Sequence, residues 1–182
     1  MSIRSVEDQR YPIGKYEPRP FSEKQLQAWL TDIKLLPGLL ENAVANLDEY
    51  QYETPYREGG WNIKQLVHHV ADSHMNAYIR FKLALTEQAP TIKTYHEELW
   101  AELNDSKNLP ANISITLLYA LHARWYETVK NIDPEDWNRL LIHPAFNKEI
   151  TLWHLLGMYS WHGLHHTAHI ASARKNYGWN EY

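Results

Sequence analysis

The stretch TLWHLLGMYSWHGLHHTAHIASARK, residues 151–175, carries the pattern that decides the fold of this chain. Its apolar residues recur every three or four positions, which predicts a helix from an N-cap at Thr151 to about Lys175. The apolar stripe consists of Leu152, Leu155, Leu156, Tyr159, Gly163, Ile170 and Ala173. A helix with one apolar stripe must bury it against other elements, so this helix needs partners from the rest of the chain.

Three further long helices are expected from capping signals and apolar spacing. Ser22 with Gln25, and Asn62 with Gln65, each form the pattern of a capping box at a helix start. A kink is expected in the first helix at Pro37, which is followed by glycine. These helices should span residues 22–47, 62–86 and 114–129.

The remaining segments read as connections. Residues 1–20 are rich in proline and read as an irregular arm. A long polar connection over residues 87–114 should contain one helical turn near 97–103, and residues 131–140 a short helical turn. Residues 141–151 are compatible with a small hairpin. Four long helices with one long crossover predict an all-α fold, a four-helix bundle forming a single domain over residues 1–182.

Composition excludes several classes of function. The 182 residues have a formal net charge of −4, with no long basic run that would favour nucleic acid or an anionic membrane. The N-terminal stretch lacks the apolar core of a secretory signal, so a cytoplasmic protein is expected. The chain has no cysteine, and any bound metal must therefore be held by histidine, aspartate or glutamate.

The last helix places histidines in two pairs, one turn apart. His162 and His166 lie at one edge of the apolar stripe, where two imidazoles at positions i and i+4 can chelate one ion. His165 and His169 lie further round. The helical wheel predicts that His165 faces solvent, and it leaves His169 either at the surface or as a partner of a ligand.

A third ligand should come from the helix over residues 62–86, which carries His68, His69 and His74. Periodicity nominates His74, which lies in the middle of the apolar stripe. His69 lies on the flank of that stripe, and a row of polar residues continues from it along the helix, as the wall of a cavity would. This row consists of Ser73, Asn76 and Arg80. Helical spacing alone leaves the choice between His69 and His74 open.

Two stretches resemble the DinB/YfiT group of four-helix bundles. They are YREGGWNIKQLVHHVADSHMNAYIRFKLALTE, residues 56–87, and YSWHGLHHTAHI, residues 159–170. Within that group they resemble YfiT-type metal-dependent hydrolases, which are related to bacillithiol S-transferases. The resemblance implies a divalent metal held by His69, His162 and His166, and a homodimer. His74 then becomes a buried core histidine that needs a hydrogen-bond partner.

Three neutral imidazoles leave the charge of a divalent ion unneutralised, so the ion can acidify a bound water or thiol. Zinc is the expected metal by ligand type, with nickel or cobalt also compatible. Gly163 follows the first histidine, where zincin proteases carry a general-base glutamate, and Asp72 lies away from the core stripe. The missing base favours transfer of a small-molecule thiol to an electrophile.

Two other functions remain open at this point: a hydrolase that uses metal-bound hydroxide, and a non-catalytic metal-binding stress-response module. Substrate-binding roles are expected for Asn76 and Arg80, which continue the stripe of His69, and for His169. A guanidinium at that place can pair with a carboxylate of the thiol.

Overall fold

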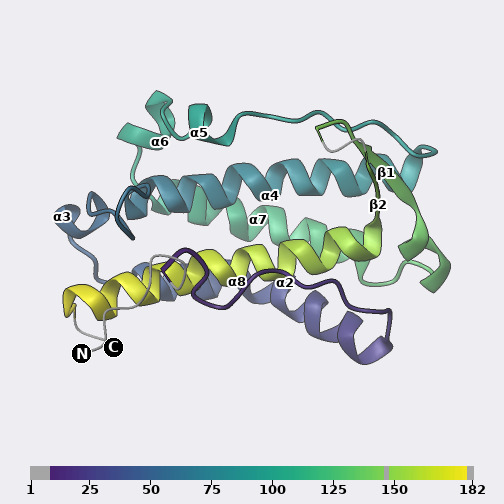
Figure 1. Cartoon of the computed structure of the whole chain (residues 1–182), viewed down its shortest axis with the longest axis horizontal. Helices are drawn as coiled ribbons and strands as arrows, with labels where there is room; N and C mark the ends of the chain where they lie inside the picture. Colours follow the sequence, from purple (N-terminus) through teal and green to yellow (C-terminus); the bar gives the residue numbers. More distant parts are fainter. Residues whose placement is uncertain (1–8, 146–147, 180–182) are drawn as a thin grey trace.

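Four long helices form the body of the molecule in the computed structural model, which describes residues 9–145 and 148–179. They are α2 (Glu23–Val44), α4 (Ile63–Thr86), α7 (Asn112–Val129) and α8 (Leu152–Tyr177). Helices α2 and α4 each pack against both α7 and α8, so α2 and α4 lie on one diagonal of the bundle (Figure 1). The prediction of a mainly helical fold, a four-helix bundle, is confirmed.

Side-chain caps begin three of these helices where the sequence predicts them. The Ser22 side chain accepts a hydrogen bond from the backbone N–H of Gln25, and the Thr151 side chain caps α8 in the same way. Asn62 and Gln65 form a reciprocal capping box at the start of α4. These contacts satisfy backbone N–H groups that would otherwise lack partners, and they therefore fix where each helix begins.

Helix α2 differs from its expected course at one end. It continues through Pro37 as one helix and ends at Val44, three residues before the predicted Leu47. Asn46 adopts a φ of 58°, in the left-handed region, which stops the helix. Two short helices also differ from expectation. They are α3 (Glu49–Tyr52), which was not predicted, and α6 (Asn104–Asn108), which lies beyond the single predicted turn at α5 (Glu97–Trp100).

The long connection between α4 and α7 sets the direction of the helices. It runs back along the bundle through α5 and α6, so α4 and α7 begin at the same end (Figure 1). Gln65 in the first turn of α4 donates to the carbonyl of Ala101, next to α5. After α7, a 3₁₀ turn (Pro134–Asn138) leads to an antiparallel hairpin, β1 (Leu140–His143) and β2 (Lys148–Thr151).

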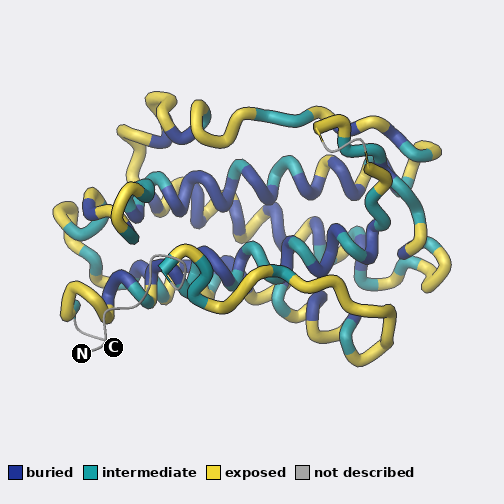
Figure 2. The backbone as a smooth tube through the Cα atoms, in the orientation of Figure 1, coloured by how far each residue is buried: buried dark blue, intermediate teal, exposed yellow. Residues whose placement is uncertain are grey.

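The two faces of α8 are covered by different parts of the chain. Its inner face packs into a core that also holds Phe81 and Trp125, and Figure 2 shows buried residues recurring along the helices of the bundle. Its outer side is covered by arm residues 9–20. Two indole N–H groups of α8 hold the arm there: that of Trp161 donates to the carbonyl of Gly14, and that of Trp153 donates to the carbonyl of Arg19. Residues 1–8 of the predicted arm lie outside the described residues. No helix in the described part of the chain is long and apolar enough to cross a membrane.

Helices α8 and α2 approach each other closely at two glycines. A Cβ at Gly157 would lie 2.5 Å from the ring of Trp29, and one at Gly163 would lie 2.5 Å from Cδ2 of Leu36. Such distances are below van der Waals contact, so only glycine permits this spacing. The glycine at position 163 is therefore a packing residue that points toward α2.

Candidate metal centre

Three histidine rings converge where α4 packs against α8. Nε2 of His162 lies 3.3 Å from Nε2 of His69 and 3.1 Å from Nε2 of His166. One ligand atom from each of the three lies within 4.8 Å of the others. With metal–nitrogen bonds of about 2.0–2.1 Å, a tetrahedral ion separates its ligand nitrogens by roughly 3.3–3.4 Å. The spacing and the donor set therefore fit a single divalent ion.

Burial keeps these three imidazoles neutral. Desolvation lowers the pKa of His69 to about 4. Burial first, and then the neighbouring histidines, hold the pKa values of His162 and His166 well below the ordinary value. A neutral imidazole has a free lone pair on one nitrogen, so all three side chains can ligate at neutral pH without losing a proton.

His74, the candidate that periodicity favoured, lies directly behind this group. It is fully buried, and its Nε2 lies 3.2 Å from Nδ1 of His162. Its Nδ1 lies 3.0 Å from Nε2 of His122 on α7. His74 thus touches the back of one ring of the group and has the hydrogen-bond partners that a buried histidine needs. His69 is the α4 histidine that faces the other two.

The prediction that His165 faces solvent is wrong. Its side chain is 7% exposed and stacks on Trp161, with ring centroids 4.4 Å apart. The helical wheel counted only the bundle core as a burying surface, whereas the N-terminal arm covers this side, with Tyr11 beside His165. His169 is also buried, with its Nε2 3.0 Å from that of His165. His165, His166 and His169 form a second group of three nearby histidines.

Two cavities meet at the group of His69, His162 and His166. A cavity of about 410 Å³ is lined by His69, His162, His165 and His166, together with Trp61 and Arg57. A second cavity of about 370 Å³ extends from His162 past Tyr159 to Arg80. His162, Trp161 and Glu97 line both of them. A small molecule bound across this junction would reach the three histidines and Arg80 together.

Of the polar stripe predicted on α4, Ser73 and Arg80 line the second cavity, and Asn76 does not. Asn76 donates from its side chain to the carbonyl of Asp72 in its own helix. On a helical wheel Ser73 and Arg80 lie about 20–40° to one side of His69, whereas Asn76 lies about 20° to the other. His169 lines neither cavity. The substrate-binding roles expected for Asn76 and His169 therefore gain no support from these two cavities.

Glu97 is a site residue that sequence reasoning missed. It belongs to α5 in the crossover connection and lines both cavities. Partial burial, and then the charge of Glu98, raises its pKa above the usual range. Position 163, next to His162, carries glycine and no carboxylate, as the sequence shows. The carboxylate near the histidine group is that of Glu97, which comes from a segment far away in the sequence. An acidic pair in a polar connection gives no signal of this placement.

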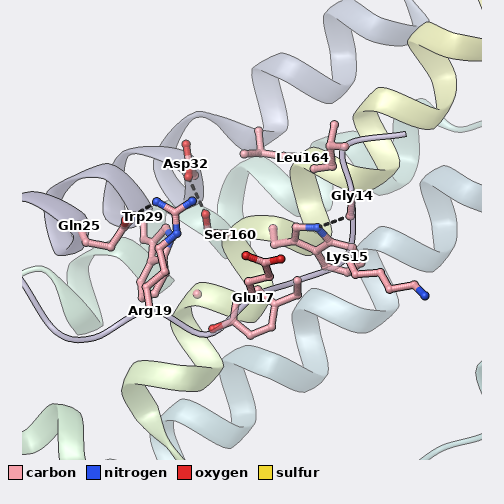
Figure 3. A pocket seen from close by; sticks show the side chains of 13 residues that line it. Gly14, Lys15, Glu17, Arg19, Gln25, Trp29, Asp32, Ser160 and Leu164 are labelled. Carbon is pink, nitrogen blue, oxygen red and sulfur yellow. Dashed lines mark hydrogen bonds between the residues drawn. The ribbon is translucent and has the colours of Figure 1, made fainter. Parts of the chain in front are cut away.

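A third cavity, of about 470 Å³, lies under the N-terminal arm (Figure 3). It is lined by arm residues and by α2 and α8, and none of His69, His162 and His166 belongs to it. Within it the Ser160 hydroxyl donates to Asp32, and burial raises the pKa of that carboxyl. This cavity is separate from the histidine group.

Comparison with known proteins agrees with the fold. The model of the DinB superfamily matches residues 33–170. A Bacillus cereus protein named "Putative metal-dependent hydrolase" is 50% identical over 96% of this chain and 100% of its own length. A Bacillus thuringiensis protein with the same descriptive name matches equally well.

A solved structure is similar over almost the whole chain. YfiT from Bacillus subtilis, described as "a probable metal-dependent hydrolase with an unusual four-helix bundle topology", superposes with a TM-score of 0.93. It is 44% identical, and the match covers 95% of this chain and 99% of that one. The four-helix bundle is thus shared with a solved structure over almost its whole length. The chain belongs to the DinB superfamily.

Proposed function

We propose that this chain is a metal-dependent enzyme whose His69, His162 and His166 hold one divalent ion. The observation that carries the proposal is the convergence of three histidine ligand atoms, all within 4.8 Å of one another, beside two cavities. Zinc suits this ligand set, and nickel or cobalt would also suit imidazole. When bound, such an ion supplies positive charge that acidifies a nucleophile and polarises a carbonyl group.

Hydrolysis of a small molecule is the reaction that the geometry supports best. Glu97 lies at the junction of the cavities with a raised pKa, which suits a group that accepts a proton from water near neutral pH. Similar proteins are named as metal-dependent hydrolases. The earlier expectation of thiol transfer rested on the lack of a base, and Glu97 removes that reason.

Thiol transfer is the second candidate, and Arg80 is the observation that favours it. Its guanidinium lines the cavity that begins at His162. Low-molecular-weight thiols such as bacillithiol carry carboxylates, so Arg80 could hold the thiol while its sulfur reaches the metal. A non-catalytic metal-binding module is the third candidate. We also propose a homodimer, which sedimentation of the purified protein would test.

Turnover by the zinc-loaded protein separates these candidates. A panel of esters and amides is compared with a thiol plus an electrophile, and the metal-stripped protein serves as the blank. Glu97→Gln should retain zinc and lose about 10²–10⁴-fold in hydrolytic kcat. Glu102 is an exposed glutamate just beyond α5, and Glu102→Gln should retain both zinc and kcat. Thiol-dependent conjugation that ignores Glu97→Gln would support transfer instead, and zinc binding without any turnover would support the binding module.

A further inference from the structure

The cavity beyond His162 contains a buried cation without a counter-ion. Arg80 is 7% exposed and forms no ion pair with any of the described residues. Its Nη1 donates to the Tyr159 hydroxyl at 3.1 Å and its Nη2 to the carbonyl of Lys93 at 3.3 Å. Its Nε is buried without a partner among the described residues. Only two of the five guanidinium N–H groups are thus satisfied by these contacts.

A buried charge is costly unless an opposite charge or hydrogen bonds compensate it. The other polar groups around Arg80 do not supply that charge. Burial raises the pKa of Tyr95 and that of Tyr159 above the ordinary value of a phenol, so both phenols are neutral. Burial, and then the positive charge of Arg80, lowers the pKa of His143. The lining of this cavity is therefore neutral apart from Arg80 itself and Glu97, which is an exposed residue and forms no ion pair with Arg80.

We propose that this cavity is an anion subsite, in which Arg80 binds a carboxylate or phosphate group of the substrate. This subsite rests on the proposed function in one respect: the other end of the bound molecule would lie at the histidine group, because His162 lines both cavities. The substrate class is then a small molecule with an anionic group at one end and its reacting bond at the other. A guanidinium is suited to such a group because it offers several donors in one plane.

The test uses the metal-free protein, so that it does not depend on the metal centre. The Nε–H signal of Arg80 is assigned by its loss in Arg80→Met and followed by ¹⁵N NMR during titration with glutarate, inorganic phosphate or neutral glutaramide. Arg174 is a matched control, since it is equally buried and donates to the carbonyls of Ala43 and Ala45.

A saturable shift of the Arg80 signal with glutarate or phosphate, absent with glutaramide, is expected, and the anion that saturates first identifies the group. Arg80→Met should weaken binding of that anion by about tenfold or more, whereas Arg174→Met should not. No shift with either anion, the same shift with glutaramide, or an equal shift at Arg174 would overturn the subsite. Failure of zinc binding would instead affect only the proposed metal centre.

A chain of three histidines carries a second, independent inference. Nδ1 of His122 is hydrogen-bonded to the carbonyl of Ile33 on α2, and its Nε2 contacts Nδ1 of His74. Nε2 of His74 in turn contacts Nδ1 of His162. The chain therefore runs from a backbone carbonyl through α7 and α4 to one ring of the histidine group.

The direction of every hydrogen bond in this chain follows from its first member. A carbonyl oxygen only accepts, so Nδ1 of His122 must carry the proton and its Nε2 must accept. His74 then donates from Nδ1 and accepts at Nε2, which leaves His162 donating from Nδ1. The lone pair of His162 is consequently on Nε2, the atom that faces His69 and His166. We infer that His74 and His122 are positioning residues that fix the tautomer and ring orientation of His162.

Metal affinity and the tautomer of His162 test this inference separately. His74→Leu should weaken zinc binding by about 10–100-fold, and His74→Gln, whose amide can donate and accept, should restore part of the affinity. His68→Leu is the matched control, because His68 is a buried histidine of the same helix, with Ser114 and Leu109 as its partners. It should lose stability and keep its zinc affinity.

The tautomer is read from long-range ¹H–¹⁵N NMR spectra of the metal-free wild-type protein. A proton on Nδ1 of His162 and a bare Nε2 are expected, with a mixture of tautomers in His74→Leu. A proton on Nε2 of His162 in the wild type would overturn the inference even if His74→Leu failed to fold. Unchanged zinc affinity in a folded His74→Leu protein would overturn it as well.

Discussion

Lowering the pH from 7 to 5 should destabilise the metal-free protein, because its buried histidines resist protonation. Burial lowers the pKa of His69 to about 4. Burial also lowers the pKa of His122 to about 4, although its hydrogen bond to the carbonyl of Ile33 acts in the opposite direction. An unfolded chain has histidine pKa values near about 6.5, so it binds more protons than the folded protein between pH 6.5 and 4. The stabilisation is thus present above pH 6.5 and is lost as the pH falls.

The magnitude follows from the two pKa values. A proton bound by the unfolded chain alone changes the free energy of unfolding by about 1.4 kcal/mol per pH unit. Integrated from pH 7 to 5, each of the two histidines removes about 2 kcal/mol, or about 4 kcal/mol together. His74, His162 and His166 act in the same direction. Such a loss is a large part of the roughly 5–15 kcal/mol that stabilises a folded domain.

Carboxylates act with the opposite sign, and a comparison of variants removes their effect. Burial, and then Asp105, raises the pKa of Asp72 to about 6, so that group gains a proton more readily in the folded state and stabilises it as the pH falls. Urea unfolding at pH 7, 6 and 5 is therefore measured for the wild type and for His122→Gln. The variant should show a smaller pH slope, by up to about 1.4 kcal/mol per unit. His96→Gln, at an exposed position, serves as the control. Equal slopes for His122→Gln and the wild type would refute the reasoning.

Three further outcomes are expected. His166→Ala should abolish zinc binding measured by elemental analysis, while His165→Ala should retain it, because His165 is outside the group that includes His69 and His162. Zinc should raise the melting temperature of the wild type by mass action, and calorimetry should show no such rise for His166→Ala. Gly163→Ala should cost about 1–3 kcal/mol in urea unfolding, because the new Cβ would overlap Leu36; stability unchanged from the wild type would show that α2 can yield at this point.

The helices could be predicted from sequence because their starting signals are local. Ser22, Asn62 and Thr151 cap helices as expected, since each cap needs only the backbone a few residues further on. The same signal was available for α3, where Asp48 and Gln51 form a reciprocal capping box. Four residues of helix bury no side chain, so apolar spacing gave no support to that signal.

The α4 histidine that groups with His162 and His166 could not be predicted from spacing, because both candidates contact the same ring at different nitrogens. His69 contacts Nε2 of His162, and His74 contacts its Nδ1. A helical wheel gives the direction in which a side chain points. It does not give the position along the helix axes at which two helices come into contact, and that position decides which nitrogen of His162 each histidine reaches. The burial of His165 has a similar origin, since the arm that covers it is irregular and leaves no periodic pattern.

The position of Gly163 explains why a carboxylate near the histidine group must come from outside this turn of α8. The residue after His162 points at Leu36 with no room for a side chain, so α8 cannot place a carboxylate there as zincin helices do. The tight α2–α8 contact that holds His162 and His166 in place thus excludes a base from the same turn. The crossover connection has no such constraint: it runs back along the bundle and brings Glu97 to the junction of both cavities. In this structure the helices position the three histidines, and the long connection supplies Glu97.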